Sequence, residues 1–401
     1  MRVRADYNGP MTNRTAPFAP MALFSMAVGG FAIGTTEFAT MGVLPEIAKG
    51  MQVSIPQAGH FISAYAIGVV VGAPVLAVLF ARTPRKVLLL GLMVAFAIGN
   101  AFSALATTST QLWWARFIAG LPHGAFFGVA SLVGAQLVGH KHRAKAVAAI
   151  MMGLNVATLA GVPLATWIGR RLDWPAVYWL VAGLAAACLL LMMRFVPKGM
   201  AGTEVHPMDE LKSLTRQPVV IALLTGAIGG CGLFSAFSYI VPTLEQHAGV
   251  PSQTVPWILA MFGVGQIIGS LTAAHFADRA LLPAIKGCLL WSALCLVIFA
   301  LLCGVQVLAA PLVFLIGTMV TLANPLQIRL MDVSGEAQTL AAAGNHASFN
   351  LANAMGAWLG GLVLTWGWGY PATGWVGAVL ALLGLALFVG SRQRPVPHRE
   401  A

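Results

Sequence analysis

Long apolar runs separated by short polar links fill the sequence from residue 21 to residue 391. A helix crosses the hydrocarbon core of a bilayer with about 20 mainly apolar residues, and runs of that length predict twelve spanning helices. The links after the third and ninth runs are very short, so each of these helices should form an antiparallel hairpin with the next. We expect the helices at residues 21–44, 57–80, 87–106, 111–138, 146–169, 174–195, 219–243, 254–277, 283–303, 307–328, 338–364 and 371–391.

The longest polar interruption, at residues 197–218, divides these helices into six plus six. Two six-helix bundles joined by a linker are a layout of secondary transporters, in which the substrate site lies between the halves. A long loop within a single bundle is the alternative, and the near-equal halves argue against it. We therefore expect a tail at residues 1–20, a bundle at 21–195, a linker at 196–218, a second bundle at 219–391 and a tail at 392–401.

The composition is that of a chain whose solvent is mostly lipid. Hydrophobic residues make up 58% of the 401 residues and charged residues only 9%, against about 25% charged residues in a soluble domain. An ordinary soluble enzyme and a disordered chain are both excluded, because the first needs a charged surface and the second needs low hydrophobicity. The five cysteines lie inside apolar runs without a C-x-x-C pair, so we expect packing residues rather than disulfides or a metal site.

The basic residues predict the orientation in the membrane. The net charge is +11, and most of the 23 lysines and arginines lie in alternate links on one side. This is the positive-inside pattern, which places both termini in the cytoplasm, and the clustering argues against nucleic-acid binding. The first apolar run is too long for the core of a signal peptide, which has about 7–15 residues. The opposite side carries Lys49, Arg170 and Arg171.

Two charged residues, Glu37 and Arg116, lie well inside apolar runs. Burying one such charge costs about 2.5–3.5 kcal/mol on insertion scales, so intramembrane charges are functional by default. At a rise of about 1.5 Å per residue, both lie roughly 7–10 Å from the outer ends of their helices. We expect an ion pair or a shared water network between them; a purely structural salt bridge is the alternative.

Glu37 and His123 are the candidates for proton exchange, together with Arg116. A carboxylate in an apolar cavity can take and release a proton near neutral pH, as coupling to a proton gradient requires. His123 lies seven residues beyond Arg116, two turns deeper on the same helix face. Histidine titrates in the physiological range, although a hydrogen-bonded packing histidine explains this position equally well.

A polar stripe marks the eleventh predicted helix. His346, Asn350 and Asn353 follow at i, i+4 and i+7 and therefore share one face. In a membrane helix such a stripe either lines a cavity or joins helices by hydrogen bonds, and we favour the cavity. Further candidates for the substrate cavity are the polar residues Thr36, Asn155, Gln266, Asn324 and Gln327 and the aromatic residues Phe234, Phe237, Tyr239 and Trp358.

Several stretches carry a resemblance to a known family. They are the 6+6 layout, GTTEFATMGVLP at residues 34–45, RFIAGLPHGAFFG at 116–128 and GAWLGG at 356–361. Together they resemble the major facilitator superfamily and, more narrowly, its twelve-spanner drug–proton antiporters of the arabinose-efflux and chloramphenicol-resistance type. The resemblance covers about residues 20–392 and implies an all-α membrane fold of twelve helices in two six-helix bundles. It also implies export in exchange for protons, with roles in proton or substrate handling for Glu37 and Arg116.

Two motifs of this branch are present in altered form. The glycine-rich motif of the fifth helix ends in Gly-Pro in the family, whereas the order here is Gly-x-Pro. Its small residues, and the glycines at positions 120, 124 and 128 of the fourth helix, should allow close packing. In the loop after the second helix Ala81 replaces the family's aspartate, so the inner latch should rest more on the second half. The helix-packing residues are Gly153, Gly161, Pro163 and Gly169, and the gating residues are Arg82, Arg85, Lys86, Asp278 and Arg279.

The sequence thus predicts a proton-coupled secondary transporter that exports a drug, sugar or related metabolite across the bacterial inner membrane by alternating access. The alternative is a proton symporter that imports a sugar, nucleoside or amino acid. An integral-membrane enzyme is disfavoured, because Glu37 is the one acid within the predicted spans and no acidic cluster or H-E-x-x-H motif is present. We expect no cofactor beyond the proton gradient as energy source, and a monomer whose partners are lipid, protons and a small-molecule substrate.

Overall fold

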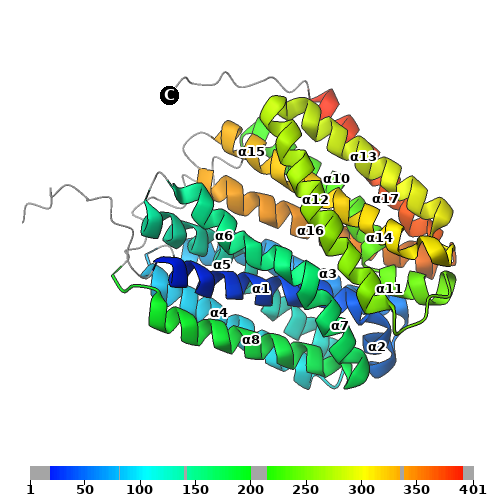
Figure 1. Ribbon diagram of the computed structural model, residues 1–401, viewed down its shortest axis with the longest axis horizontal. Coiled ribbons are helices and arrows are strands. Elements are labelled where there is room, and N and C mark those ends of the chain that lie inside the picture. Colours follow the sequence, from blue (N-terminus) through cyan, green and yellow to red (C-terminus); the bar gives the residue numbers. More distant parts are fainter. Residues whose placement is uncertain (1–18, 81, 140–141, 200–214, 335–337, 392–401) are drawn as a thin grey trace, which may run out of the picture.

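The computed structural model describes residues 19–80, 82–139, 142–199, 215–334 and 338–391, which are helical almost throughout (Figure 1). The predicted tails and most of the predicted linker lie outside these residues. The N-terminal half contains α1 (Ala19–Gly42), α2 (Leu44–Gly50), α3 (Ile55–Leu79), α4 (Arg85–Leu105), α5 (Ser109–Val138), α6 (Arg143–Val156), α7 (Val162–Arg171) and α8 (Trp174–Phe195). The C-terminal half contains α10 (Gln217–Phe237), α11 (Ile240–Pro242), α12 (Val255–Arg279), α13 (Leu281–Leu302), α14 (Ala309–Thr318), α15 (Ala323–Ser334), α16 (Gln338–Thr365) and α17 (Pro371–Gly390).

Each of the twelve predicted spans corresponds to a long helix or to a pair of helices in line. Within the described residues, 11 spans are long and apolar enough to cross a membrane. The remaining long helix is α16, with 28 residues, and it is the helix that carries the polar stripe. Its lower hydropathy fits a helix that faces protein rather than lipid, because polar side chains in a bilayer need partners.

The fifth and tenth spans are interrupted. A π-helical turn at Ala157–Gly161 joins α6 to α7 just before Pro163, where proline removes a backbone donor and local helical adjustments are common. A 3₁₀ turn at Met319–Leu322 joins α14 to α15. The prediction that the tenth span ends at residue 328 was wrong. Helix α15 continues to Ser334, and Arg329 is only 3% exposed, because it shares a buried helix face with Leu326 and Leu330.

The helices form two bundles of six spans. In the N-terminal half α3 packs on α5, α4 packs on α5 and α8, and α1 packs on α6 and α8. In the C-terminal half α10 packs on α16 and α17, and α12 packs on α14. The halves meet mainly where α3 packs on α16 and where α12 packs on α7 and the π turn before it. We call the end of the molecule that carries α2, at the right of Figure 1, the α2 end, and the opposite end the α15 end.

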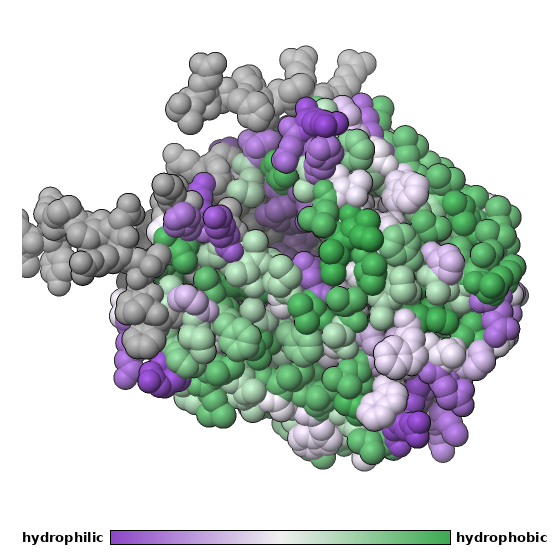
Figure 2. Space-filling view, in the orientation of Figure 1, coloured by the Kyte–Doolittle hydropathy of each residue, from purple (hydrophilic) through white to green (hydrophobic). Residues whose placement is uncertain are grey.

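The surface is apolar over its middle. Figure 2 shows hydrophobic residues over most of this face, with hydrophilic residues gathered toward the ends and in a recess between the halves near α6 and α15. Large apolar side chains are widely exposed, among them Leu79, Leu271 and Leu301. Such an extent of exposed apolar surface fits lipid contact and is not found on soluble monomers.

Glycine allows the backbones of α3 and α5 to touch. A Cβ added at Gly120 would overlap the carbonyl oxygen of Tyr65, and one added at Gly68 would overlap that of Phe117. Small residues at helix interfaces permit this approach in membranes. The expectation that Gly128 takes part was wrong, because a Cβ at that position meets nothing within 4 Å.

Gly120 and Gly128 therefore form a matched pair on one helix. We predict that Gly120→Ala lowers the free energy of unfolding by about 1–3 kcal/mol, the usual cost of overpacking. Gly128→Ala should leave it unchanged or raise it by up to about 1 kcal/mol, since alanine favours the helix. Thermal unfolding of the two purified variants in detergent measures the difference. Equal melting temperatures would contradict the packing described for α3 and α5.

Candidate functional site

Arg116 lies at the centre of the N-terminal half and is fully buried. Its Nη1 donates to Thr36 Oγ1 at 2.9 Å, and its Nη2 donates to the Thr36 carbonyl oxygen at 3.2 Å. Thr36 Oγ1 in turn donates to Asn100 Oδ1 at 2.7 Å. The guanidinium lies over the rings of Tyr65 and Tyr178, at 4.4 and 5.0 Å from their centroids. Three helices, α1, α3 and α8, thus contact one cation through hydrogen bonds and cation–π contacts, and Asn100 of α4 holds Thr36 in place.

Glu37 follows Thr36 on α1 and is 7% exposed. The expected ion pair with Arg116 is not formed, since no carboxylate oxygen of Glu37 lies within 4 Å of an Arg116 nitrogen. The side chains of consecutive helical residues point about 100° apart. Because Arg116 is hydrogen-bonded to Thr36, its guanidinium lies away from the Glu37 carboxylate. The carboxylate still interacts electrostatically with Arg116, and it approaches the side chain of Asn353 on α16. Glu37 therefore faces the opposite half of the molecule.

His123 continues this polar core along α5. Its Nδ1 lies 3.1 Å from the Tyr65 hydroxyl, and the ring meets Phe127 edge-on with centroids 5.4 Å apart. Phe127 in turn stacks on His346 of α16, with centroids 5.5 Å apart and an interplanar angle of 5°. Tyr65 thus touches both His123 and Arg116, and an aromatic contact leads from His123 across to the other half.

The polar stripe of α16 faces the N-terminal half, as the cavity interpretation requires. His346 meets Phe127, and Asn353 lies beside Glu37. Asn350 is buried between them, where its Nδ2 donates to the His346 carbonyl oxygen at 3.1 Å. The Oδ1 atom of Asn350 and both polar side-chain atoms of Asn353 have no partner at hydrogen-bonding distance. The two amide oxygens can therefore accept hydrogen bonds from a polar substrate group, and Asn353 Nδ2 can donate one.

The other cavity candidates divide into three groups. Asn155 joins the halves, because its Oδ1 accepts from Gln266 Nε2 of α12 at 3.1 Å. Phe234 and Tyr239 are buried, and the Tyr239 hydroxyl donates to the Ala357 carbonyl oxygen at 2.6 Å, which makes Tyr239 part of the helix packing. Asn324 is exposed and does not join the polar core.

The predicted packing motif lies against α1 and α8. A Cβ added at Gly153 would overlap the Ala27 carbonyl oxygen, one at Gly161 would overlap Thr35, and one at Gly169 would lie 2.7 Å from Val43 and 2.8 Å from Val177. Pro163 follows the π turn. Glycine is needed at these positions because no side chain fits between the helices.

The predicted gating residues form no latch in this conformation. Lys86 donates to the carbonyl oxygens of Met193 and Val196, at 2.8 and 2.5 Å, and so binds the end of α8. Asp278 and Arg279 are exposed, as is Arg82, and Arg85 is partly buried. No ion pair joins any of them to another described residue. Ala81 lies outside the described residues.

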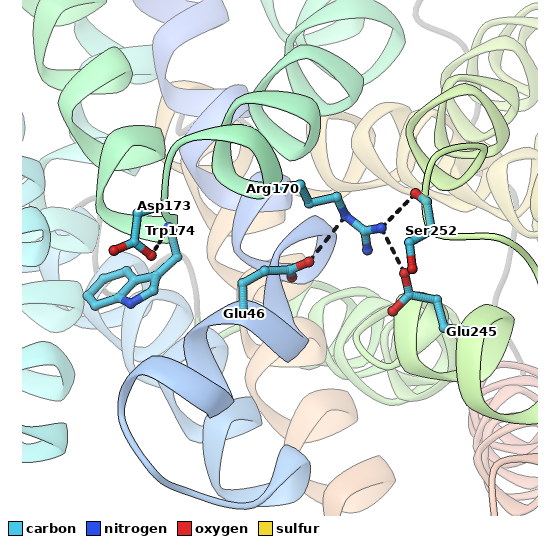
Figure 3. Close-up of polar contacts among 6 residues, drawn as sticks. All are labelled: Glu46, Arg170, Asp173, Trp174, Glu245 and Ser252. Carbon is cyan, nitrogen blue, oxygen red and sulfur yellow. Dashed lines mark hydrogen bonds and ion pairs between the residues drawn. The ribbon is translucent and has the colours of Figure 1, made fainter.

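Ion pairs between described residues instead occur at the α2 end, where Arg170 bridges the halves (Figure 3). Its Nη1 contacts Glu245 Oε1 at 2.7 Å, and its Nε lies 3.2 Å from Glu46 Oε1. Burial raises the pKa of the Glu46 carboxyl above its ordinary value; Arg170 works against this increase and Glu245 adds to it. The sequence placed Arg170 in an outer link, whereas it lies in the last turn of α7.

The comparisons with known proteins agree with this architecture. Residues 26–335 match the family model of the Major Facilitator Superfamily. The inner membrane transport protein YdhP of Escherichia coli (strain K12) is 39% identical over 93% of this chain and 96% of its own length. The chloramphenicol resistance protein of Streptomyces lividans is 33% identical over 84% of this chain and 87% of its own.

Solved structures show the same fold. The crystal structure of the nucleoside transporter NupG superposes with a TM-score of 0.70 at 14% identity, covering 95% of this chain and all of the other. Two six-helix bundles, a buried polar core between them and relatives that are transporters over nearly the whole length lead to one conclusion. The chain belongs to the major facilitator superfamily, and it is a membrane transporter rather than an enzyme.

Proposed function

We propose that this protein exports a small molecule across the bacterial inner membrane in exchange for protons, by alternating access between its two halves. The observation that carries the proposal is the position of Glu37. Its carboxylate is buried within the N-terminal half, close to Arg116, and faces Asn353 of the C-terminal half. A relative movement of the halves therefore changes the surroundings of this one acid.

Proton exchange at Glu37 follows from the cost of buried charge. A carboxylate inside a protein is stable as an anion only when it is paired or hydrogen-bonded. In the conformation described here Arg116 is the nearby positive charge, the Asn353 side chain lies beside the carboxylate without a hydrogen bond to it, and burial disfavours the anion. Separation of the halves withdraws Asn353 and admits water, which alters whether Glu37 holds a proton. Arg116 cannot move away with the other half, because Thr36, Tyr65 and Tyr178 hold it within its own bundle.

The substrate site in this proposal lies between Glu37 and the stripe of α16. Asn350, Asn353 and His346 supply polar groups, and Phe127 supplies an apolar surface. A few placed polar groups within an apolar wall are typical of small-molecule sites. The predicted orientation places the α2 end outside the cell, and the halves contact each other there through Arg170. The named relative that confers chloramphenicol resistance favours export, whereas the likeness to NupG concerns the fold alone.

The proposal is tested by Glu37→Gln in reconstituted vesicles. Glutamine keeps the shape of the side chain but cannot exchange a proton, so pH-gradient-driven transport should be abolished while the protein still inserts into the membrane. Glu37→Asp, which keeps the acid, should retain part of the coupling. Reversing the pH gradient distinguishes exchange from symport, since in exchange the substrate moves in the direction opposite to the protons. Undiminished gradient-driven transport by Glu37→Gln would refute the role of this residue.

A second test asks whether the shape of the Arg116 guanidinium, and not only its positive charge, is needed for coupled transport. Lysine at this position keeps the charge but lacks the planar fork whose two nitrogens bind Thr36, and it stacks less well on aromatic rings. We predict that Arg116→Lys abolishes coupled transport and lowers the free energy of unfolding by about 0.5–2 kcal/mol, the range of a cation–π contact. Arg171→Lys is the control, because Arg171 is exposed. Transport by Arg116→Lys at the level of the control would show that a positive charge alone suffices.

A further inference from the structure

We propose that Arg170 is the latch of the α2 end and that it works with two carboxylates in turn. Glu245 binds it across the interface while this end is closed, and Glu46 receives it when the halves separate. The proposal deepens the proposed function, because it presumes that the two halves move apart during transport. It concerns residues far from the buried site around Glu37.

Two of the three charged residues belong to the N-terminal half and one belongs to the C-terminal half. Glu46 lies on α2 and Arg170 lies at the end of α7, so both belong to the N-terminal half. Glu245 lies in the π-helical turn Thr243–His247 after α11, and Ser252 lies in the loop that follows. Figure 3 shows the guanidinium between the two carboxylates. Separation of the halves therefore breaks the contact with Glu245 and leaves the contact with Glu46.

In this conformation Arg170 contacts the C-terminal half more closely than it contacts Glu46. Its Nη1 donates to Glu245 Oε1 and to the Ser252 carbonyl oxygen, both at 2.7 Å. Its Nε lies 3.2 Å from Glu46 Oε1 but makes no hydrogen bond of good geometry. Arg170 Nη2 and Glu46 Oε2 are buried without any partner. A guanidinium and a carboxylate prefer two parallel hydrogen bonds, and these unused atoms can complete such a pair once Glu245 has left.

Two carboxylates explain how the latch can open. The Arg170 side chain is only 12% exposed. If Arg170 lost its only carboxylate partner at a site this buried, the uncompensated charge would strongly destabilise the protein. An arginine that moves to a second carboxylate avoids this cost. Glu46 thus lowers the barrier to opening, and Glu245 together with Ser252 holds the closed state.

An apolar layer lies on the same interface. Phe38 of α1 contacts Phe237 of α10 and Phe262 of α12, with ring centroids 6.2 and 5.9 Å apart. All three rings are buried. Ser63 of α3 adds a hydrogen bond to the Ala354 carbonyl oxygen of α16 at 2.9 Å. Among the described residues these contacts have no alternative partner, whereas Arg170 has a second carboxylate beside it.

The test measures the distance between the halves at the α2 end. Spin labels on cysteines that replace Leu105 and Val307 report it, because both residues are exposed near this end, at 60% and 82%. The five native cysteines are buried. Glu245→Gln should add a population at longer distance, since the closed state loses its ionic contact. Glu46→Gln should do the opposite and keep the short distance alone, because Arg170 then has no partner in the open state.

Controls separate the latch from a general loss of structure. Arg171→Gln changes the exposed neighbour of Arg170 and should match the parent protein. Arg170→Gln combined with Glu245→Gln should open the α2 end no further than either variant alone, as expected for two residues that act through one contact. A variant counts only if its melting temperature and size-exclusion profile match those of the parent.

Two results would overturn the proposal. One is a Glu245→Gln distance distribution identical to that of the parent; the other is equal opening in Glu46→Gln and Glu245→Gln, which would indicate simple loss of charge. The distances are measured without substrate or proton gradient. A failure of proton-coupled export would therefore leave them unchanged, and a failure of the latch would leave the Glu37 assay unchanged.

Discussion

The buried cation Arg116 is the constraint around which the N-terminal half is organised. A charge at this depth is tolerated only where protein groups replace water, and here they come from α1, α3 and α8. The arrangement requires close helices, which explains why glycine lies where α3 and α5 touch. It also explains why Glu37 is turned away from Arg116, since Thr36 takes both Nη atoms of the guanidinium. The acid is thereby left facing the other half.

Much of this could be read from the sequence, because lipid imposes simple rules. Runs of about 20 apolar residues located every span but not the short helix α2, and the scarcity of charge identified Glu37 and Arg116 as buried. The stripe of His346, Asn350 and Asn353 predicted one face of α16 correctly, because helical periodicity fixes which residues share a face. The partner of Arg116 could not be predicted, since a threonine and two tyrosines in apolar runs carry no signal of their own.

The bridge at the α2 end was missed for a different reason. Glu46, Arg170 and Glu245 lie in the links between the predicted spans, where isolated charges are normally solvated and indicate only topology. Their meeting depends on how the two halves pack, and pairing between links 75 residues apart has no local pattern. Arg329 was misplaced in a similar way, because a helix that extends beyond its apolar run can still bury one face. Tertiary packing decides the role of such charges.

The two ends of the molecule differ in this conformation. At the α2 end an ion pair, aromatic rings and backbone contacts join the halves. Toward the α15 end an apolar groove of about 200 Å³ lies between α3, α10 and α16, and the predicted gating residues at that end make no ion pair with described residues. This is the asymmetry that alternating access requires of one of its states. Glu37 lies between the two ends, where either opening can reach it.

Proton exchange at Glu37 is the step on which the proposed transport cycle depends. The most direct measurement is proton release by the purified protein in weakly buffered detergent solution, followed with a pH-sensitive dye as transported substrate is added. Proton release is expected from the parent protein and none from Glu37→Gln, with substrate binding by both. Equal proton release from the two proteins would contradict it.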